Sequence, residues 1–152
     1  AKVEVAANRY RDINPDLQVN SLEVRAMPEN MADFHLEAYD YALDAVDTVT
    51  AKLAILSACS HSDTPVISCM GTGNKLDPAR LEIAPIEKTA VCPLARVMRR
   101  ELKARGIAGI PVVYSREEPR IKVSPPGSVS FVPGAAGLMM AGYAISKMIE
   151  KR

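Results

Sequence analysis

The sequence predicts an α/β domain of Rossmann-like type, in which a mostly parallel sheet is covered by helices on both faces. Short apolar runs of strand length alternate along the chain with longer runs that have helical spacing. Parallel strands need crossover connections, and helices commonly supply them. With 152 residues, 48% of them hydrophobic, the chain suits a single domain, 1–152, with a real core.

The elements of the first half follow from periodicity and turn residues. Residues 2–13 carry apolar side chains at helical spacing, and Asn14-Pro15 ends that helix. Strands are predicted at 18–24 and 39–46. A helix then begins at the plausible cap Asp47-Thr48 and reaches about residue 61.

The second half continues the alternation of strands and helices. Strands are predicted at 64–70, 81–86 and 110–114, and a basic amphipathic helix is predicted at 93–106. Residues 115–129 are rich in proline and charge, which indicates a mobile loop. Residues 133–149 form an apolar helix whose proline, glycines and Lys147 favour packing on the sheet over insertion in a membrane.

Charge and cysteine content restrict the classes of function. The formal net charge is +1, so no bulk field attracts nucleic acid or a membrane, and any RNA contact must come from a local patch. Cys59, Cys69 and Cys92 form no Cys-x-x-Cys pair, which argues against a disulfide framework and against a structural zinc site. We therefore expect a cytoplasmic protein without zinc.

Two carboxylates are the leading candidates for a ligand site. Asp44 and Asp47 lie where a predicted strand ends and a helix begins, and in open α/β sheets ligands sit at the carboxyl ends of the strands. Carboxylates there can hold Mg²⁺ or ribose hydroxyls, although an Asp at a helix start is also the ordinary cap. By itself, Lys2 is a surface cation, and Gly71-Thr72-Gly73 is too short for a dinucleotide fingerprint.

Several segments, in order, resemble signatures of the ThiF/MoeB/HesA family of adenylating enzymes, which are similar to ubiquitin-activating enzymes. The general signatures of the family are Lys2–Glu4, Asp12–Pro15, Asp44–Lys52 and Gly73–Pro78. Three later segments resemble its tRNA threonylcarbamoyladenosine dehydratase branch: Pro93–Val97 with Arg99–Leu102, Val113–Pro119 and Gly127–Pro133. The absence of paired Cys-x-x-Cys ligands also favours this branch.

The resemblance implies a chemistry and residue roles. Such enzymes bind ATP and Mg²⁺ and convert a carboxylate to an acyl adenylate, here for the cyclising dehydration of threonylcarbamoyladenosine in tRNA. Lys2 matches the family lysine at the ATP phosphates, and Asp47 matches the aspartate of the ATP and metal site, with Asp44 beside it. The basic helix could present a tRNA-contacting patch, or only a solvated face: Arg96, Arg99, Arg100, Lys103 and Arg105.

The resemblance also implies that the chain is the C-terminal part of an adenylating domain, truncated at its N-terminus. The family's Gly-rich loop, ribose-binding acidic residue and catalytic arginine precede the position of Lys2, so we expect 1–152 alone to be inactive. Two alternatives stay open. One is adenylation of a ubiquitin-like sulfur carrier, with Cys92 as the candidate cysteine and a cysteine desulfurase as a possible partner. The other is a non-catalytic dimerisation or binding module. A homodimer is expected under all three interpretations.

Overall fold

A four-stranded mixed sheet forms the centre of the protein. The computed structural model describes residues 1–119 and 123–150. The strands occur in the spatial order β1-β2-β4-β3, in which β1 pairs parallel with β2 and β2 pairs parallel with β4, whereas β3 is antiparallel to β4. Their bounds are Ala42–Asp44 for β1, Val66–Cys69 for β2, Leu81–Pro85 for β3 and Pro111–Ser115 for β4.

The antiparallel direction of β3 follows from its short connection. The chain passes from β2 to β3 through residues 70–80, which contain only one turn of 3-10 helix, η3 (Pro78–Arg80). A parallel return would need a longer crossover, usually with an α-helix. The sheet is therefore parallel in two of its three pairings, and the predicted strand at 81–86 runs opposite to its neighbour.

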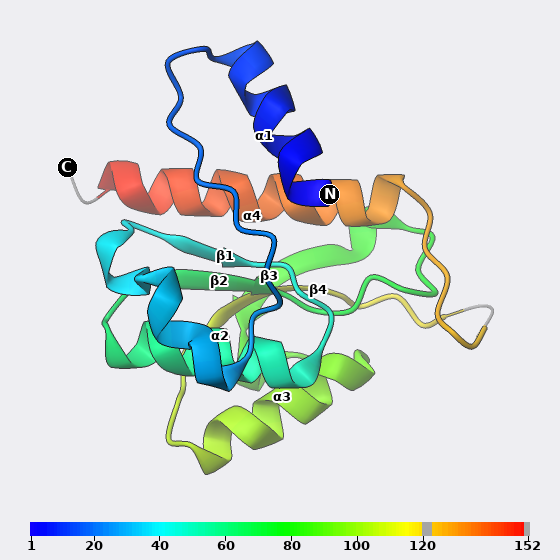
Figure 1. Cartoon of the computed structure of the whole chain (residues 1–152). Helices are drawn as coiled ribbons and strands as arrows, with labels where there is room; N and C mark the ends of the chain where they lie inside the picture. The colour runs from blue at the N-terminus through cyan, green and yellow to red at the C-terminus, as the bar shows by residue number, and fades with distance from the viewer. Residues whose placement is uncertain (120–122, 151–152) are drawn as a thin grey trace.

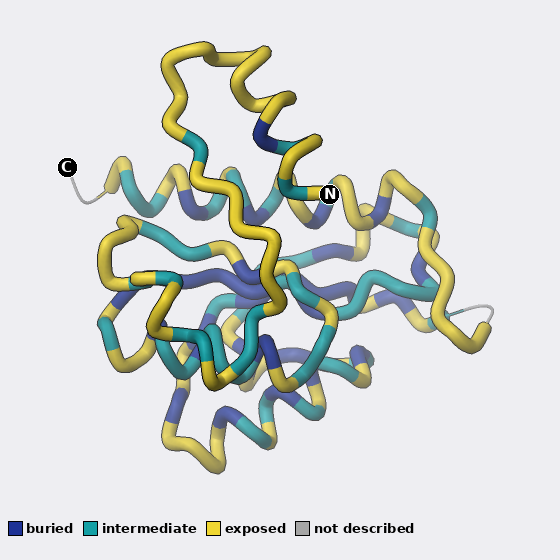
Figure 2. The backbone as a smooth tube through the Cα atoms, in the orientation of Figure 1, coloured by how far each residue is buried: buried dark blue, intermediate teal, exposed yellow. Residues whose placement is uncertain are grey.

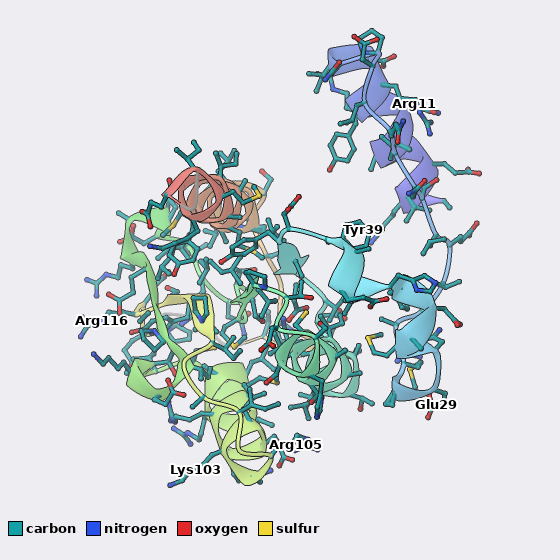
Figure 3. The ribbon with its side chains drawn as sticks, turned by 90° about the vertical axis from the view of Figure 1, so that its left-hand side faces the viewer. Arg11, Glu29, Tyr39, Lys103, Arg105 and Arg116 are labelled. Atoms are coloured by element: carbon teal, nitrogen blue, oxygen red, sulfur yellow. The ribbon has the colours of Figure 1, made fainter. Side chains whose placement is uncertain are left out.

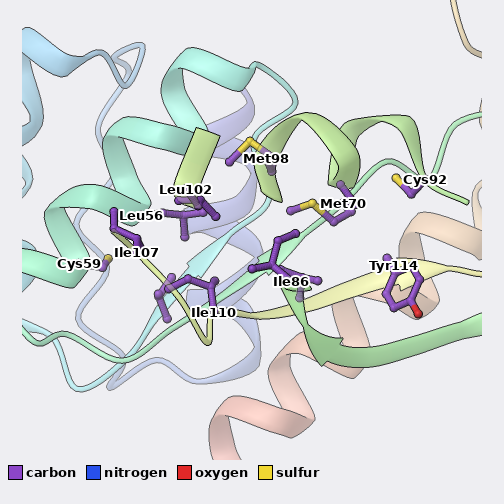
Figure 4. Close-up of a cluster of buried hydrophobic side chains, with 13 residues drawn as sticks. Leu56, Cys59, Met70, Ile86, Cys92, Met98, Leu102, Ile107, Ile110 and Tyr114 are labelled. Atoms are coloured by element: carbon purple, nitrogen blue, oxygen red, sulfur yellow. The ribbon is translucent and has the colours of Figure 1, made fainter. Parts of the chain in front are cut away.

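Two helices cover one face of the sheet. Helix α2 (Val49–His61) and helix α3 (Pro93–Ala104) pack against β2 and β4 and lie below the sheet in Figure 1. Figure 4 shows Leu56 and Leu102, one from each helix, beside Ile107 and Ile110. These side chains are excluded from water, and their burial is the main favourable term in folding.

One long helix covers the opposite face. Helix α4 (Phe131–Glu150) lies above the sheet in Figure 1, as the sequence predicts for its apolar C-terminal stretch. Val132, Ala136 and Met140 are buried against Ile67 of β2 and Val113 of β4. Among the helices that the structure describes, none combines the length and apolarity that crossing a bilayer requires.

The N-terminal segment is confirmed as a helix but not as a strand. Helix α1 (Lys2–Ile13) has the predicted bounds, and Figure 3 shows it standing apart from the sheet. The predicted strand at 18–24 is wrong, because those residues form no helix or strand, and Figure 2 shows this stretch almost entirely exposed. Leu22 and Val24 have strand-like character, but a strand also needs a neighbour for its backbone hydrogen bonds.

Short 3-10 helices also occur between the α-helices and strands, and the sequence did not indicate them. Helices η1 (Pro28–Phe34) and η2 (Leu36–Ala38) lead into β1, and η4 (Ile86–Lys88) follows β3. The predicted strand at 39–46 is shorter than expected, since only its middle pairs with β2. In the predicted loop 115–129, β4 extends through Ser115, the other described residues are irregular, and residues 120–122 lie outside the described part of the chain.

Candidate functional site

Three loops meet at the edge of the sheet where the parallel strands end. Because β1, β2 and β4 are parallel, their carboxyl ends lie at the same edge, and residues 45–48, 70–75 and 116–118 follow them. The antiparallel strand β3 begins there, and the Arg116 N–H donates to the carbonyl of Arg80 at 2.9 Å. Ligands of open α/β sheets bind at such an edge, as the sequence predicts for this chain.

Asp44 is buried beneath this edge in an ion pair. Its Oδ2 accepts hydrogen bonds from Lys52 Nζ at 2.9 Å and from the Ser68 hydroxyl at 2.6 Å, and the Lys52 and Asp44 side chains are both 0% exposed. Its Oδ1 accepts from the Val46 N–H at 3.1 Å. Both carboxylate oxygens of Asp44 therefore have protein partners, and its direct contact with a cofactor stays a prediction.

Asp47 has a different environment from Asp44. It is exposed in the turn between β1 and α2, and its carboxylate accepts no hydrogen bond from residues 1–119 or 123–150. Thr48 occupies the N-cap position of α2 without a side-chain capping bond, so neither residue of the predicted cap acts as one through its side chain. Asp47 is the carboxylate of this turn that faces solvent.

Lys2 lies on the exposed part of α1. Figure 3 shows that helix standing apart from the sheet, and no hydrogen bond or ion pair joins Lys2 to the sheet edge in the described chain. The role of Lys2 at the ATP phosphates therefore stays a prediction.

Lys52 and Ser68 are functional candidates that sequence reasoning missed. Lys52 falls within the Asp44–Lys52 motif, but the motif match gave it no role. The signal was a single lysine inside the otherwise apolar run Ala51–Leu56 of a helix predicted to cover the sheet. A lysine on such a face is almost never fully buried unless it is paired.

A second buried polar group joins the loops that follow β2 and β4. The Glu117 carboxylate accepts from the Leu76 N–H at 2.9 Å and from the Asp77 N–H at 2.9 Å, and the Lys75 ammonium donates to the Glu117 carbonyl. Lys75 and Glu117 are both buried. They hold the Gly73–Asp77 segment against the segment after β4.

The turn at Gly73 and Asn74 fastens the described part of the long loop. The Asn74 N–H donates to the Gly127 carbonyl at 2.7 Å, and Asn74 Nδ2 donates to the Val123 carbonyl at 3.2 Å. A Cβ on Gly73 would lie 2.8 Å from Cβ of Pro126, so this close approach requires glycine. A cavity of about 230 Å³ opens beside the turn, lined in part by Lys75, Val123 and Gly127.

The basic helix α3 presents three exposed cations on one side. Arg96, Arg100 and Lys103 recur at helical spacing and are exposed, as the predicted patch requires. Arg99 differs, because its half-buried guanidinium donates to the carbonyl of Thr89 at 2.7 Å and to the hydroxyl of Thr89 at 2.8 Å. The structure therefore separates Arg99 from the exposed patch.

The fifth cation of the predicted patch, Arg105, is the C-cap residue of α3 and pairs with an acid of that helix. Arg105 Nη1 lies 3.0 Å from Glu101 Oε2, and Arg100 Nη2 lies 2.9 Å from Glu101 Oε1. The hydrogen bonds from Arg105 and Arg100 hold the pKa of Glu101 below its ordinary value. The two ion pairs partly neutralise this end of α3.

Each of the three thiols is either buried or has a pKa above the ordinary value of cysteine. Cys92 precedes α3, but it is buried in the core between the sheet and helices α2 and α3. Burial raises the pKa of Cys59 to about 11, and burial also raises the pKa of Cys69. A protonated thiol is a poor nucleophile, so Cys59 and Cys69 lack the features of reactive cysteines.

The protein side chains at this edge suit Mg²⁺ only if phosphate oxygens of a substrate supply further ligands. In residues 1–119 and 123–150, no three His, Cys, Asp or Glu side chains are grouped as metal ligands. Mg²⁺ is commonly held by one or two carboxylates together with substrate phosphates. The exposed carboxylate of Asp47 at the strand end fits that arrangement.

The chain is similar to known proteins over its whole length. The model of the ThiF family matches residues 1–152. A tRNA threonylcarbamoyladenosine dehydratase of Bacillus subtilis is 35% identical over 168 residues, which cover 98% of this chain and 66% of that protein, so the chain spans about two thirds of that relative. The sulfur carrier protein ThiS adenylyltransferase of Escherichia coli is 34% identical over 77 residues, covering 49% of this chain and 30% of that protein.

The fold of the chain is also similar to that of a solved structure. The crystal structure of the Escherichia coli tRNA N6-threonylcarbamoyladenosine dehydratase TcdA in complex with ATP has a TM-score of 0.91 and 30% identity, covering 99% of this chain and 65% of that one. This likeness confirms the predicted Rossmann-like α/β fold. Because the family model and these relatives span nearly every residue, the chain belongs to the ThiF family.

Proposed function

We propose that the native protein uses ATP and Mg²⁺ to adenylate a carboxylate, and that this carboxylate belongs to threonylcarbamoyladenosine in tRNA. The observation that carries the proposal is the likeness of 99% of the chain to a dehydratase solved in complex with ATP. The exposed carboxylate of Asp47, at the ligand-binding edge of the sheet, supports it independently.

The proposed chemistry has two steps. Bound ATP supplies an activated α-phosphorus, to which a substrate carboxylate oxygen bonds while the bond to pyrophosphate breaks. An internal nucleophile of the same substrate then attacks the activated carbonyl and releases AMP, so the substrate loses the elements of one water. In this scheme Asp47 holds Mg²⁺, and Lys2 offsets phosphate charge that increases during the transfer.

The decisive experiment measures pyrophosphate release by the native protein with Mg-ATP and tRNA that carries threonylcarbamoyladenosine. We expect release to depend on that modification, with AMP and a tRNA lighter by one water as the other products. The matched control is the same tRNA with unmodified adenosine, which has no carboxylate to activate. Equal release with both tRNAs, or none with either, would contradict the proposal.

A second candidate substrate is the C-terminus of a ubiquitin-like sulfur carrier. The similarity of half the chain to a ThiS adenylyltransferase favours it. The burial of Cys92 does not, because a thiol that forms a covalent bond to a partner must be accessible. The dehydratase relative also covers twice as much of this chain, so tRNA is the preferred substrate.

The exposed cations of α3 are proposed to contact tRNA phosphates. Replacing Arg96, Arg100 and Lys103 with alanine should weaken tRNA binding, and the slope of log affinity against log salt should become shallower by about 2–3, since each phosphate contact contributes just under one. Filter binding across a salt series measures both quantities. The matched control removes three exposed cations of the N-terminal segment: Arg9, Arg11 and Arg25.

The two triple variants have the same net charge, so an equal loss of slope in both would show only a general charge effect. A slope that changes in the α3 variant alone supports a local contact surface. If the α3 variant keeps the native slope, the cations form an ordinary solvated face and tRNA binds elsewhere.

A homodimer in the cytoplasm completes the proposal. The outer side of α4 exposes large apolar side chains at seven-residue spacing, Phe131, Leu138 and Ile145, and Leu138 is 77% exposed. An exposed apolar stripe of this kind favours a protein partner. A second copy of the chain is the partner that we propose.

A further inference from the structure

The turn that carries Asp47 is held from both sides by one residue of α2. The Lys52 N–H donates to the Thr48 carbonyl at 3.0 Å, which is the first hydrogen bond of the helix. The ammonium of the same residue donates to Asp44 Oδ2 at 2.9 Å, on the strand side of the turn. Lys52 therefore connects the residues on either side of 45–47.

Asp44 connects the turn to the neighbouring strand. Its Oδ1 accepts the Val46 N–H at 3.1 Å, inside the turn. Its Oδ2 accepts the Ser68 hydroxyl at 2.6 Å, and Asp44 and Ser68 are direct partners in the parallel register of β1 and β2. Lys52 Nζ also donates to Ser68 Oγ at 3.2 Å, so the three side chains form a closed network.

This network is excluded from water. Counted as whole residues, Lys52 and Ser68 are 0% exposed and Asp44 is 2% exposed. Removing two charges from water is costly, and a well-packed apolar pair is often as stable as a buried ion pair. Stability alone therefore does not account for the network, whereas the directions of its hydrogen bonds do constrain the backbone of the turn.

We propose that Asp44, Lys52 and Ser68 form a positioning network that fixes the turn between β1 and α2 and thereby orients Asp47 toward Mg-ATP. Within the network, Oδ1 of Asp44 acts on the turn directly through the Val46 N–H, while Lys52 and Ser68 hold the Asp44 carboxylate in place. The proposal rests on the proposed function of Asp47. It assigns Asp44 a role through the backbone, not a contact with the nucleotide.

Two double variants of the native protein separate this role from charge and burial. Asp44→Asn with Lys52→Met keeps an oxygen that can accept from the Val46 N–H, whereas Asp44→Leu with Lys52→Met does not. Both lack the buried charges. We expect the Kd of the Leu variant for Mg-ATP to be at least about ten-fold higher than that of the Asn variant. Removal of groups that orient a metal ligand typically has an effect of this size.

Two measurements decide the outcome: the Kd for Mg-ATP by calorimetry, and hydrogen exchange of the Val46 amide. We expect that amide to exchange slowly in the wild type and in the Asn variant, and at least about ten-fold faster in the Leu variant, because its acceptor is gone. Lys88→Met, at an exposed position outside the network, should match the wild type in both measurements.

Equal Mg-ATP affinity of the two double variants would overturn the positioning role, and so would equal exchange at Val46. A wild type that does not bind Mg-ATP would overturn the proposed function, and unchanged exchange at Val46 would still exclude the network as the support of the turn. If the Leu variant does not fold, Ser68→Ala is compared with the wild type, because it removes the hydrogen bond that holds Asp44 Oδ2 without removing a charge. We then expect weaker Mg-ATP binding and faster exchange at Val46, and no change in either measurement would overturn the network.

Discussion

The Lys52→Met variant is expected to lose about 3–5 kcal/mol of unfolding free energy, because it leaves the carboxylate of Asp44 buried without its counter-ion. The methionine fills nearly the same volume, so the loss comes from the uncompensated charge and not from a cavity. Urea denaturation of the native protein, followed by circular dichroism, measures the change. A loss of this size is large against the 5–15 kcal/mol that stabilise most folded proteins.

A double variant tests whether the uncompensated charge of Asp44 causes this loss of stability. Adding Asp44→Asn to Lys52→Met removes the buried charge, so most of the lost stability should return. Lys88→Met, a lysine change at an exposed position, should alter the stability by no more than about 0.5 kcal/mol. If the single Lys52 variant is as stable as the Lys88 variant, the ion pair is not a buried interaction in solution.

The Asp47→Asn variant is expected to lower kcat/KM for the tRNA reaction by about 10²–10³-fold, the effect of removing one group that stabilises charge in a transition state. Asparagine keeps the size of the side chain but not the negative charge that favours binding of Mg²⁺. Because Asp47 is exposed and accepts no hydrogen bond from the described part of the chain, the stability should remain that of the wild type. Steady-state kinetics at several Mg²⁺ concentrations provide the measurement.

A nearby carboxylate supplies the control for Asp47. Asp40 is exposed and lies just before β1, at the amino end of that strand and away from the ligand-binding edge. Asp40→Asn removes the same charge and should leave kcat/KM unchanged within about two-fold, since surface substitutions away from a site have little effect. Full activity of Asp47→Asn would exclude Asp47 from the metal and nucleotide site.

Local patterns were sufficient for the α-helices. The spacing of apolar residues at 2–13 and 133–149, and the proline at position 93, predicted α1, α4 and the start of α3 with only small errors in their bounds. Strands were harder, because each depends on a neighbour that periodicity does not reveal. The segment 18–24 has the composition of a strand and no strand beside it, and the segment 81–86 is a strand in a direction that the sequence did not indicate.

The sequence by itself determined the class of fold, the family and the identity of Asp47 as a candidate, because periodicity and motifs are properties of neighbouring residues. Only the tertiary structure decided that Asp44 is buried against Lys52 and Ser68, and that Arg99 lies apart from the other cations of α3. Asp44 and Ser68 are 24 positions apart in the chain. They meet because the parallel pairing of β1 with β2 places them opposite one another, and that register depends on the packing of both faces of the sheet.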